Sequence, residues 1–273
     1  EIYKKTQKDA NKLVEEFMLL ANKRVGRFVG STERKTSVPL IYRVHDKPDL
    51  EKVQQFAVFV SKFGKTFKYN NEKDIAKNMN ALFEEMRDEN EFMLIQQMAI
   101  KTMSKAVYDT ENIGHYGLGF DYYAHFTSPI RRYADLMVHR ILFNDLNKSH
   151  TSYKGLTQTA EHISITERRA TEAERASKKY FQALYLQDKE GEVFAGSITG
   201  LTEWGMYVEM EENFCEGMIS LKSMRGERYQ FDADQYVVYG TNSGEEFNLG
   251  DRVFVKVLKV SLAKKQIDLE LLD

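Results

Sequence analysis

Two adjacent arginines, Arg131 and Arg132, follow the sequence Thr127-Ser128-Pro129, and this combination could bind a phosphate group. Thr and Ser are preferred N-cap residues, and Pro suits the first turn of a helix. The spacing therefore predicts a helix over residues 128–146 with Arg131 in its first turn. There the guanidinium would lie beside backbone N–H groups without an intrahelical partner, at the positive end of the helix dipole. Together these groups favour an anion such as phosphate.

The same residues also fit a purely structural role. Helical spacing relates four apolar residues of this segment, Ile130, Ala134, Met137 and Ile141. Asp135 lies four residues after Arg131, so the two side chains could form a local ion pair. Spacing alone leaves phosphate binding and local pairing as open alternatives.

The elements that would position this segment are mostly helical up to residue 190. Apolar residues at intervals of three and four predict helices over 6–27, 50–63, 73–87, 90–106, 128–146 and 157–188. The apolar stripe of the first helix consists of Leu13, Val14, Phe17, Met18, Ala21 and Val25. His115, His125 and His139 lack metal-ligand spacing, so we expect buried or capping histidines there.

At Gly191 the pattern changes to short stretches of alternating apolar and polar residues. These cover residues 191–198, 205–210, 252–260 and 266–271, with glycine-containing turns between them. Such strands indicate a small antiparallel barrel. We therefore expect an α+β chain of two domains, residues 1–189 and residues 190–273.

The composition is that of a soluble globular protein, with 42% hydrophobic and 29% charged residues. The single cysteine, Cys215, excludes an internal disulfide and is typical of a reducing compartment, so we expect a cytoplasmic protein. The chain has no long uncharged apolar stretch, which argues against a membrane helix and a membrane partner. Residues 191–273 hold 8 Lys and Arg against 15 Asp and Glu, whereas the first 190 residues hold 31 against 26. Phosphate binding should therefore be local and confined to the first part.

The string from Tyr123 to Arg140 resembles the RNB-domain signature of the ribonuclease II and ribonuclease R family, and Ile113–Leu118 resembles the segment before it. The resemblance covers nearly the whole chain, but only the later part of an RNB domain. It implies a 3′-to-5′ exoribonuclease that hydrolyses single-stranded RNA to nucleoside 5′-monophosphates, with Mg²⁺ held by an aspartate cluster. No cluster of the Asp-x-Asp-Asp type occurs in this sequence, so we expect this stretch alone to be inactive. We interpret Asp135 and Asp145 as structural.

The part after Gly191 resembles the S1-type OB-fold RNA-binding domain. The matching motifs are Gly191-x-Val193-x-x-Gly196-x-Ile198, Trp204-Gly205-Met206-Tyr207-Val208 and Glu216-Gly217-Met218-Ile219-Ser220. Insertions at 224–231 and 240–250 resemble the version of this domain that follows the RNB domain in ribonuclease R. Exposed aromatic residues of OB folds stack on bases, and Phe194, Trp204 and Tyr207 are the candidates here, although each could instead fill the barrel core. Ser220 replaces a histidine common in the family, which puts one RNA contact in doubt.

The resemblance also implies roles for particular side chains in the first part. Arg131 matches the arginine that steadies the scissile phosphate. The residues expected along an RNA channel are Arg132, Tyr133, Glu15, Glu16 and Glu174. Each glutamate could instead belong to a solvated helix face, and Glu174 could pair with Lys178 four residues later.

The expected function is degradation of single-stranded RNA by a monomeric exoribonuclease. One alternative is a noncatalytic RNA-binding protein that kept the channel wall and the barrel but lacks the aspartate cluster. A second alternative is a helical interaction scaffold without a role in RNA binding, which the specific pairing of the two domains disfavours. RNA affinity that falls as salt is added would exclude the scaffold.

Overall fold

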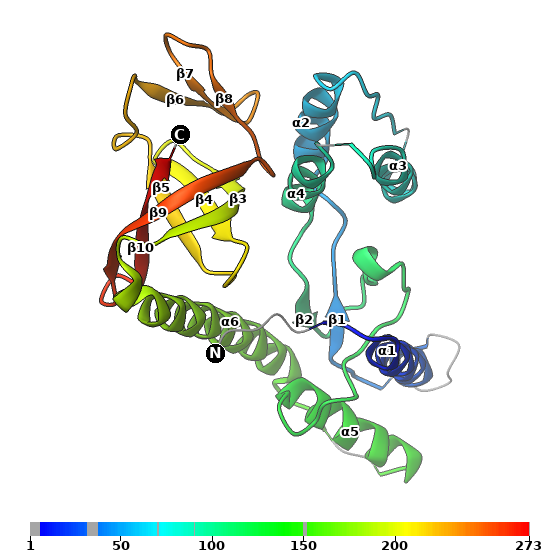
Figure 1. The fold of residues 1–273 in the computed structure, drawn as a ribbon. Coiled ribbons are helices and arrows are strands. Elements are labelled where there is room, and N and C mark those ends of the chain that lie inside the picture. Colours follow the sequence, from blue (N-terminus) through cyan, green and yellow to red (C-terminus); the bar gives the residue numbers. More distant parts are fainter. Residues whose placement is uncertain (1–5, 32–37, 70, 90, 150–151, 273) are drawn as a thin grey trace. The chain divides into compact units, whose positions relative to one another are not determined.

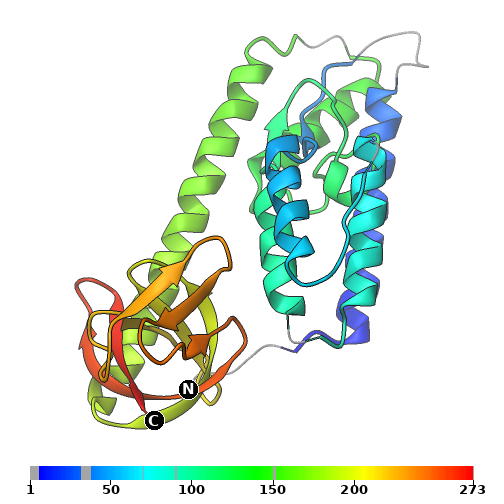
Figure 2. The same cartoon turned by 90° about the horizontal axis from the view of Figure 1, so that it is seen from above.

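A computed structural model describes residues 6–31, 38–69, 71–89, 91–149 and 152–272. These residues form two compact units. The signature unit consists of residues 6–49 and 103–172, and the barrel unit of residues 50–102 and 173–272. Helix α6 (Leu156–Leu186) contributes to both units and is continuous along its length (Figure 2).

The signature unit packs helices around a small two-stranded sheet. Its elements are α1 (Asp9–Gly30), β1 (Tyr42–Val44), β2 (Val107–Asp109), the short 3-10 helix η1 (Tyr116–Leu118), α5 (Tyr133–Leu146) and the first part of α6 (Figure 1). Strands β1 and β2 are antiparallel, with Arg43 opposite Tyr108. The buried core includes Val29, Ile41, Val44, Tyr108, Ala124, Val138, Ile141 and Ala160. The core therefore joins both strands to α1, α5 and α6.

Helix α1 buries only part of the apolar stripe expected for it. Leu13, Val14 and Phe17 are more than half exposed, whereas Val25 and Val29 pack into the core. Amphipathic spacing was correct for the helix, but only its second half has a covering surface among the described residues.

The barrel unit begins with three helices and continues into a closed barrel. The helices are α2 (Leu50–Ser61), α3 (Glu72–Glu85) and α4 (Phe92–Thr102). After α6 and the 3-10 helix η2 (Gln187–Lys189), the barrel strands are β3 (Val193–Leu201), β4 (Gly205–Met210), β5 (Glu216–Ser220), β9 (Arg252–Ser261) and β10 (Gln266–Leu272). Alternate residues point inward, so Ile198, Val208 and Val255 are buried. The alternation in the sequence thus predicted the barrel.

The expectation of a wholly antiparallel barrel was wrong. The strand order is β10-β5-β4-β3-β9, and β10 pairs with β5 in parallel, with Met218 opposite Asp268. The other barrel pairs are antiparallel. The direction of the two strands that close the barrel depends on which strands meet, and the alternation of apolar residues carries no information about that.

The close approach of β4 and β5 requires glycine at position 205. A Cβ at Gly205 would lie 2.3 Å from the carbonyl oxygen of Ile219.

A three-stranded sheet interrupts the barrel between β5 and β9. It consists of β6 (Tyr229–Asp232), β7 (Val237–Gly240) and β8 (Glu246–Phe247), all antiparallel (Figure 1). Lys101 of α4 donates a hydrogen bond to the Tyr236 hydroxyl at 3.0 Å, and Lys62 donates to the carbonyl oxygen of Asp234 at 2.6 Å. These bonds join the insertion to the helices of the same unit.

None of the helices in the described ranges is both long enough and apolar enough to cross a bilayer. The domain boundary at residues 189–190 stays a prediction, because the two compact units group the chain differently.

Candidate functional site

The two arginines lie before α5 rather than inside its first turn, so the expected helix over 128–146 was wrong at its start. Helix α5 begins at Tyr133, and Arg132 is its N-cap with extended backbone angles. The carbonyl oxygen of Ser128 accepts hydrogen bonds from the N–H groups of Arg131 at 3.3 Å and Arg132 at 3.0 Å, which closes a separate turn. Arg131 therefore belongs to an exposed turn, and the helix-dipole argument for phosphate binding at Arg131 does not hold.

Side chains from α1 and α5 hold the backbone that leads into this turn. Asn22 of α1 accepts a hydrogen bond from the N–H of Phe126 at 2.9 Å and donates one to the Tyr123 hydroxyl at 3.2 Å. The His139 ring stacks on Phe126 with centroids 4.0 Å apart, and its Nε2 lies 2.8 Å from the Phe126 carbonyl oxygen. Asp135 accepts a hydrogen bond from the N–H of Ser128 at 2.7 Å. The signature segment is thus fixed by tertiary contacts rather than by a helix.

Close packing of α1 on the signature segment depends on Gly26. A Cβ at this position would lie 3.0 Å from the backbone nitrogen of Ala124 and 3.2 Å from the backbone of Tyr123. Asn22 is on the same buried side of the helix, one turn earlier. The backbone of α1 therefore approaches the signature segment directly.

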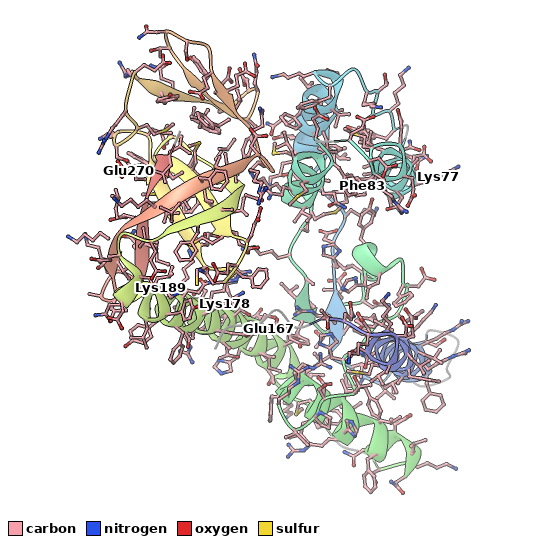
Figure 3. All side chains as sticks on the ribbon, in the orientation of Figure 1. Lys77, Phe83, Glu167, Lys178, Lys189 and Glu270 are labelled. Carbon is pink, nitrogen blue, oxygen red and sulfur yellow. The ribbon has the colours of Figure 1, made fainter. Side chains whose placement is uncertain are left out.

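Ion pairs of the described residues in this region involve Arg132 and Arg43 but not Arg131. Arg132 donates to the Asp135 carboxylate at 2.8 Å, so the pair expected for Arg131 is formed by its neighbour. Arg43 of β1 pairs with Glu167 of α6 at 2.7 Å, and Glu167 is labelled in Figure 3. Arg131 is exposed and has no acidic partner among the described residues. One uncompensated guanidinium therefore faces solvent from a fixed turn.

His125 and Tyr108, which contact each other in the signature unit, are neutral at physiological pH. Burial and the guanidinium groups of Arg132 and Arg43 lower the pKa of His125 to about 3. Its Nδ1 lies 2.8 Å from the Tyr108 hydroxyl, whose pKa is raised to about 12 by burial and the Glu167 carboxylate. Burial and nearby His45 lower the pKa of His115 to about 4. Buried or capping histidines were expected here. His115 and His125 are half-buried, His115 is the N-cap of η1, and neither carries a charge that could compete with Arg131 for an anion.

The glutamates proposed for an RNA channel are all exposed. Glu15 precedes the buried Asn22 by seven residues, which places both on one face of α1, and it accepts a hydrogen bond from Gln7 at 3.0 Å. Glu16 is on the adjacent face. Glu174 belongs to the barrel unit, whereas Arg131 belongs to the signature unit. Their proposed roles stay predictions.

The residues present do not fit the metal site that the resemblance implies. Within the described ranges, no three His, Cys, Asp or Glu side chains are grouped so that they could hold a metal ion. Mg²⁺ requires oxygen ligands at near-ideal octahedral positions, and it is usually bound by carboxylates. The described residues therefore offer no such set of carboxylates.

The three aromatic candidates of the barrel differ in exposure. Phe194 is buried in the barrel, only 6% exposed, so stacking by this ring is excluded and it is a core residue. Trp204 is 65% exposed, immediately before β4. Tyr207 is half-buried and lines a pocket with Lys179 and Lys265. Trp204 and Tyr207 are therefore accessible to a ligand.

Sequence reasoning missed Asn22, Arg43 and Glu167 as residues of this site. Asn22 had a signal, because it is a polar residue one turn from Met18 on the buried side of α1. Arg43 and Glu167 are 124 positions apart, and their pairing has no local signature. Asp135 was interpreted as structural, and the structure shows that it is fully buried and ion-paired with Arg132.

Two protein-family models match this chain. The model of the RNB domain matches residues 1–148, and the model of the S1 RNA binding domain matches residues 187–272. Ribonuclease R of Escherichia coli is 35% identical over 97% of this chain and 34% of its own length. Ribonuclease R of Aquifex aeolicus is 34% identical over 100% of this chain and 38% of its own length.

A solved structure has the same fold. RNase R of Mycoplasma genitalium in complex with ribose-methylated single-stranded RNA superposes with a TM-score of 0.83 at 26% identity, covering 98% of this chain and 42% of that one. The chain thus spans little more than a third of the length of its curated relatives. On these matches, the chain belongs to the ribonuclease R family of RNB-domain proteins.

Proposed function

We propose that residues 1–273 contribute the phosphate-contacting turn and the RNA-binding barrel of a 3′-to-5′ exoribonuclease. The substrate is single-stranded RNA, and the products are nucleoside 5′-monophosphates released by hydrolysis of the terminal phosphodiester bond. The observation that carries this proposal is Arg131, an exposed and unpaired guanidinium on a turn fixed by Asn22 and Asp135. A pre-positioned charge can stabilise a phosphate as negative charge develops on it.

The other residues of the chain assist binding in this proposal. Within the signature unit, Glu15, Glu16 and Tyr133 line the path of the RNA backbone, and Arg132, paired with Asp135, forms part of its wall. Glu174 contacts RNA separately, from the barrel unit. Trp204 and Tyr207 offer ring faces for stacking on bases, which tolerates any sequence. The metal that such hydrolysis uses would polarise the phosphate and activate water, and its aspartate ligands would be residues outside this sequence. We also propose that the protein is monomeric and cytoplasmic.

The direct test uses the natural polypeptide that contains residues 1–273, with its intact mass measured first. A 5′-labelled oligoribonucleotide should shorten from its 3′ end and release nucleoside 5′-monophosphates in a Mg²⁺-dependent reaction. Arg131→Ala should lower kcat by about 100-fold, the usual effect of removing one group that stabilises developing charge, with a much smaller change in RNA affinity. Arg140→Ala, at an exposed arginine of α5, is the matched control and should leave kcat within about twofold of the wild-type value. Equal kcat for Arg131→Ala and the wild type would refute the role of Arg131.

A second candidate function is noncatalytic RNA binding. It is favoured by the lack of a metal-holding group among the described residues. An intact mass equal to 31.8 kDa, combined with salt-dependent RNA binding and no cleavage, would establish this function instead.

A further inference from the structure

A fully buried carboxylate follows the arginine pair. Asp135 is 0% exposed, and its Oδ2 accepts hydrogen bonds from the Ser128 N–H at 2.7 Å and from the Arg132 guanidinium at 2.8 Å. One oxygen atom therefore binds the first and the last residue of the turn that presents Arg131. Because Asp135 is on the first turn of α5, this bond also fixes the turn to the helix.

This arrangement is poorly suited to stabilising the fold. Burying a carboxylate costs several kcal/mol, and a buried ion pair often contributes no more than apolar residues of similar volume. In addition, Asp135 Oδ1, Arg132 Nε and Thr127 Oγ1 are buried without a hydrogen-bond partner among the described residues. Unsatisfied polar atoms destabilise a protein, so the network is better explained by the geometry it imposes.

The network determines which arginine is available. Arg132 is held against Asp135 with only 21% of its side chain exposed, while Arg131, one residue earlier, is exposed and unpaired within the described chain. The neighbouring Ile130 and Tyr133 are also exposed, so the surface beside Arg131 is open to solvent. Without Asp135, the turn would lose the two hydrogen bonds from this carboxylate, and either guanidinium could face the anion.

We propose that Asp135 is a positioning residue for Arg131. Its carboxylate immobilises the turn 128–132 and neutralises Arg132, so that the Arg131 guanidinium alone is presented to an RNA phosphate. This inference rests on the proposed function. It assigns to Asp135 no contact with RNA and no proton transfer.

The test is a double-mutant cycle on kcat in the natural polypeptide. Asp135→Asn retains the size of the side chain but removes the charge and replaces one acceptor oxygen with an amino group. We expect kcat to fall between about 10-fold and 100-fold, since misplacement of a binding group by about 1 Å can have an effect of that size. KM should change less than about twofold. Asp145→Asn, on the same helix but away from the turn, should leave both constants unchanged.

The decisive comparison is with Arg131→Ala. If Asp135 acts through Arg131, the variant carrying both substitutions should have the kcat of Arg131→Ala alone. A merely structural defect would reduce kcat further in the double variant, and this result would overturn the inference. Thermal unfolding of each variant shows whether it is folded at the assay temperature.

Should Asp135→Asn fail to fold, the pair Arg132→Gln with Asp135→Asn removes both charges and leaves no unpaired buried ion. The same comparison with and without Arg131→Ala then applies, with the same expected lack of additivity. A wild-type polypeptide that degrades no RNA would refute the proposed function and this inference together. A wild type that degrades RNA, combined with additive effects, would refute the inference alone.

Discussion

Replacing Asn22 with alanine should loosen the signature segment and destabilise the unit that contains it. Asn22 is 3% exposed and makes two hydrogen bonds to residues more than 100 positions away. Alanine leaves the Phe126 N–H without an acceptor, at a cost of about 1–3 kcal/mol, and loss of the bond to the Tyr123 hydroxyl adds about 1 kcal/mol. We therefore expect the free energy of unfolding to fall by about 2–4 kcal/mol.

Two measurements separate local loosening from global destabilisation. Urea unfolding followed by circular dichroism reports the helices, and hydrogen exchange of peptides across residues 122–128 reports the Phe126 amide. Loss of about 1–3 kcal/mol at that amide corresponds to exchange faster by about 5- to 150-fold. Asn22→Asp keeps an acceptor for Phe126 and should preserve more of its protection than Asn22→Ala.

The matched control is Asn80→Ala, the same chemical change at an exposed position of α3. It should change stability by less than about 0.5 kcal/mol. The reasoning would be refuted if Asn22→Ala changed stability no more than Asn80→Ala and left exchange at Phe126 unaltered.

Three further predictions concern the rest of the chain. Trp204 is the single tryptophan and is exposed, so oligouridylate should quench its fluorescence. Trp204→Ala should weaken oligouridylate binding by about 1–3 kcal/mol. Phe254→Ala, at an exposed aromatic residue of β9, is the control and should not weaken it. The pKa of His125 is about 3 in the folded chain and about 6.5 when unfolded, so the unfolded state binds more protons below pH 6.5 and stability should fall as the pH decreases from 6.5 towards 3. The urea midpoint should fall less between pH 7.5 and pH 4.5 in His125→Gln than in the wild type. In the control His162→Gln, at an exposed histidine, it should fall as much as in the wild type. Cys215 is buried and burial raises the pKa of its thiol to about 11, so Ellman's reagent at pH 8 should label it only after unfolding; rapid labelling of the native protein would contradict its burial.

Local patterns in the sequence predicted the elements of secondary structure and the barrel. Spacing of apolar residues predicted α1 to α6, and alternation predicted β3, β4, β9 and β10, because both patterns follow from the period of the backbone itself. The pattern was misleading at residues 128–132. There a Ser-Pro sequence typical of a helix start forms a separate turn, whose Ser128 N–H is bound by Asp135 of the following helix.

The sequence by itself determined the family, the helical and barrel elements, and the identity of Arg131 as the candidate phosphate ligand. Only the tertiary structure decided that Arg132 pairs with Asp135 while Arg131 stays unpaired within the described residues. It also decided that Phe194 is buried while Trp204 is exposed, and that β5 and β10 are parallel. Helical and strand periods are properties of neighbouring residues. Charge pairing, burial and strand direction depend instead on segments far apart in the chain, as the contacts from Asn22 to Phe126 and from Arg43 to Glu167 demonstrate.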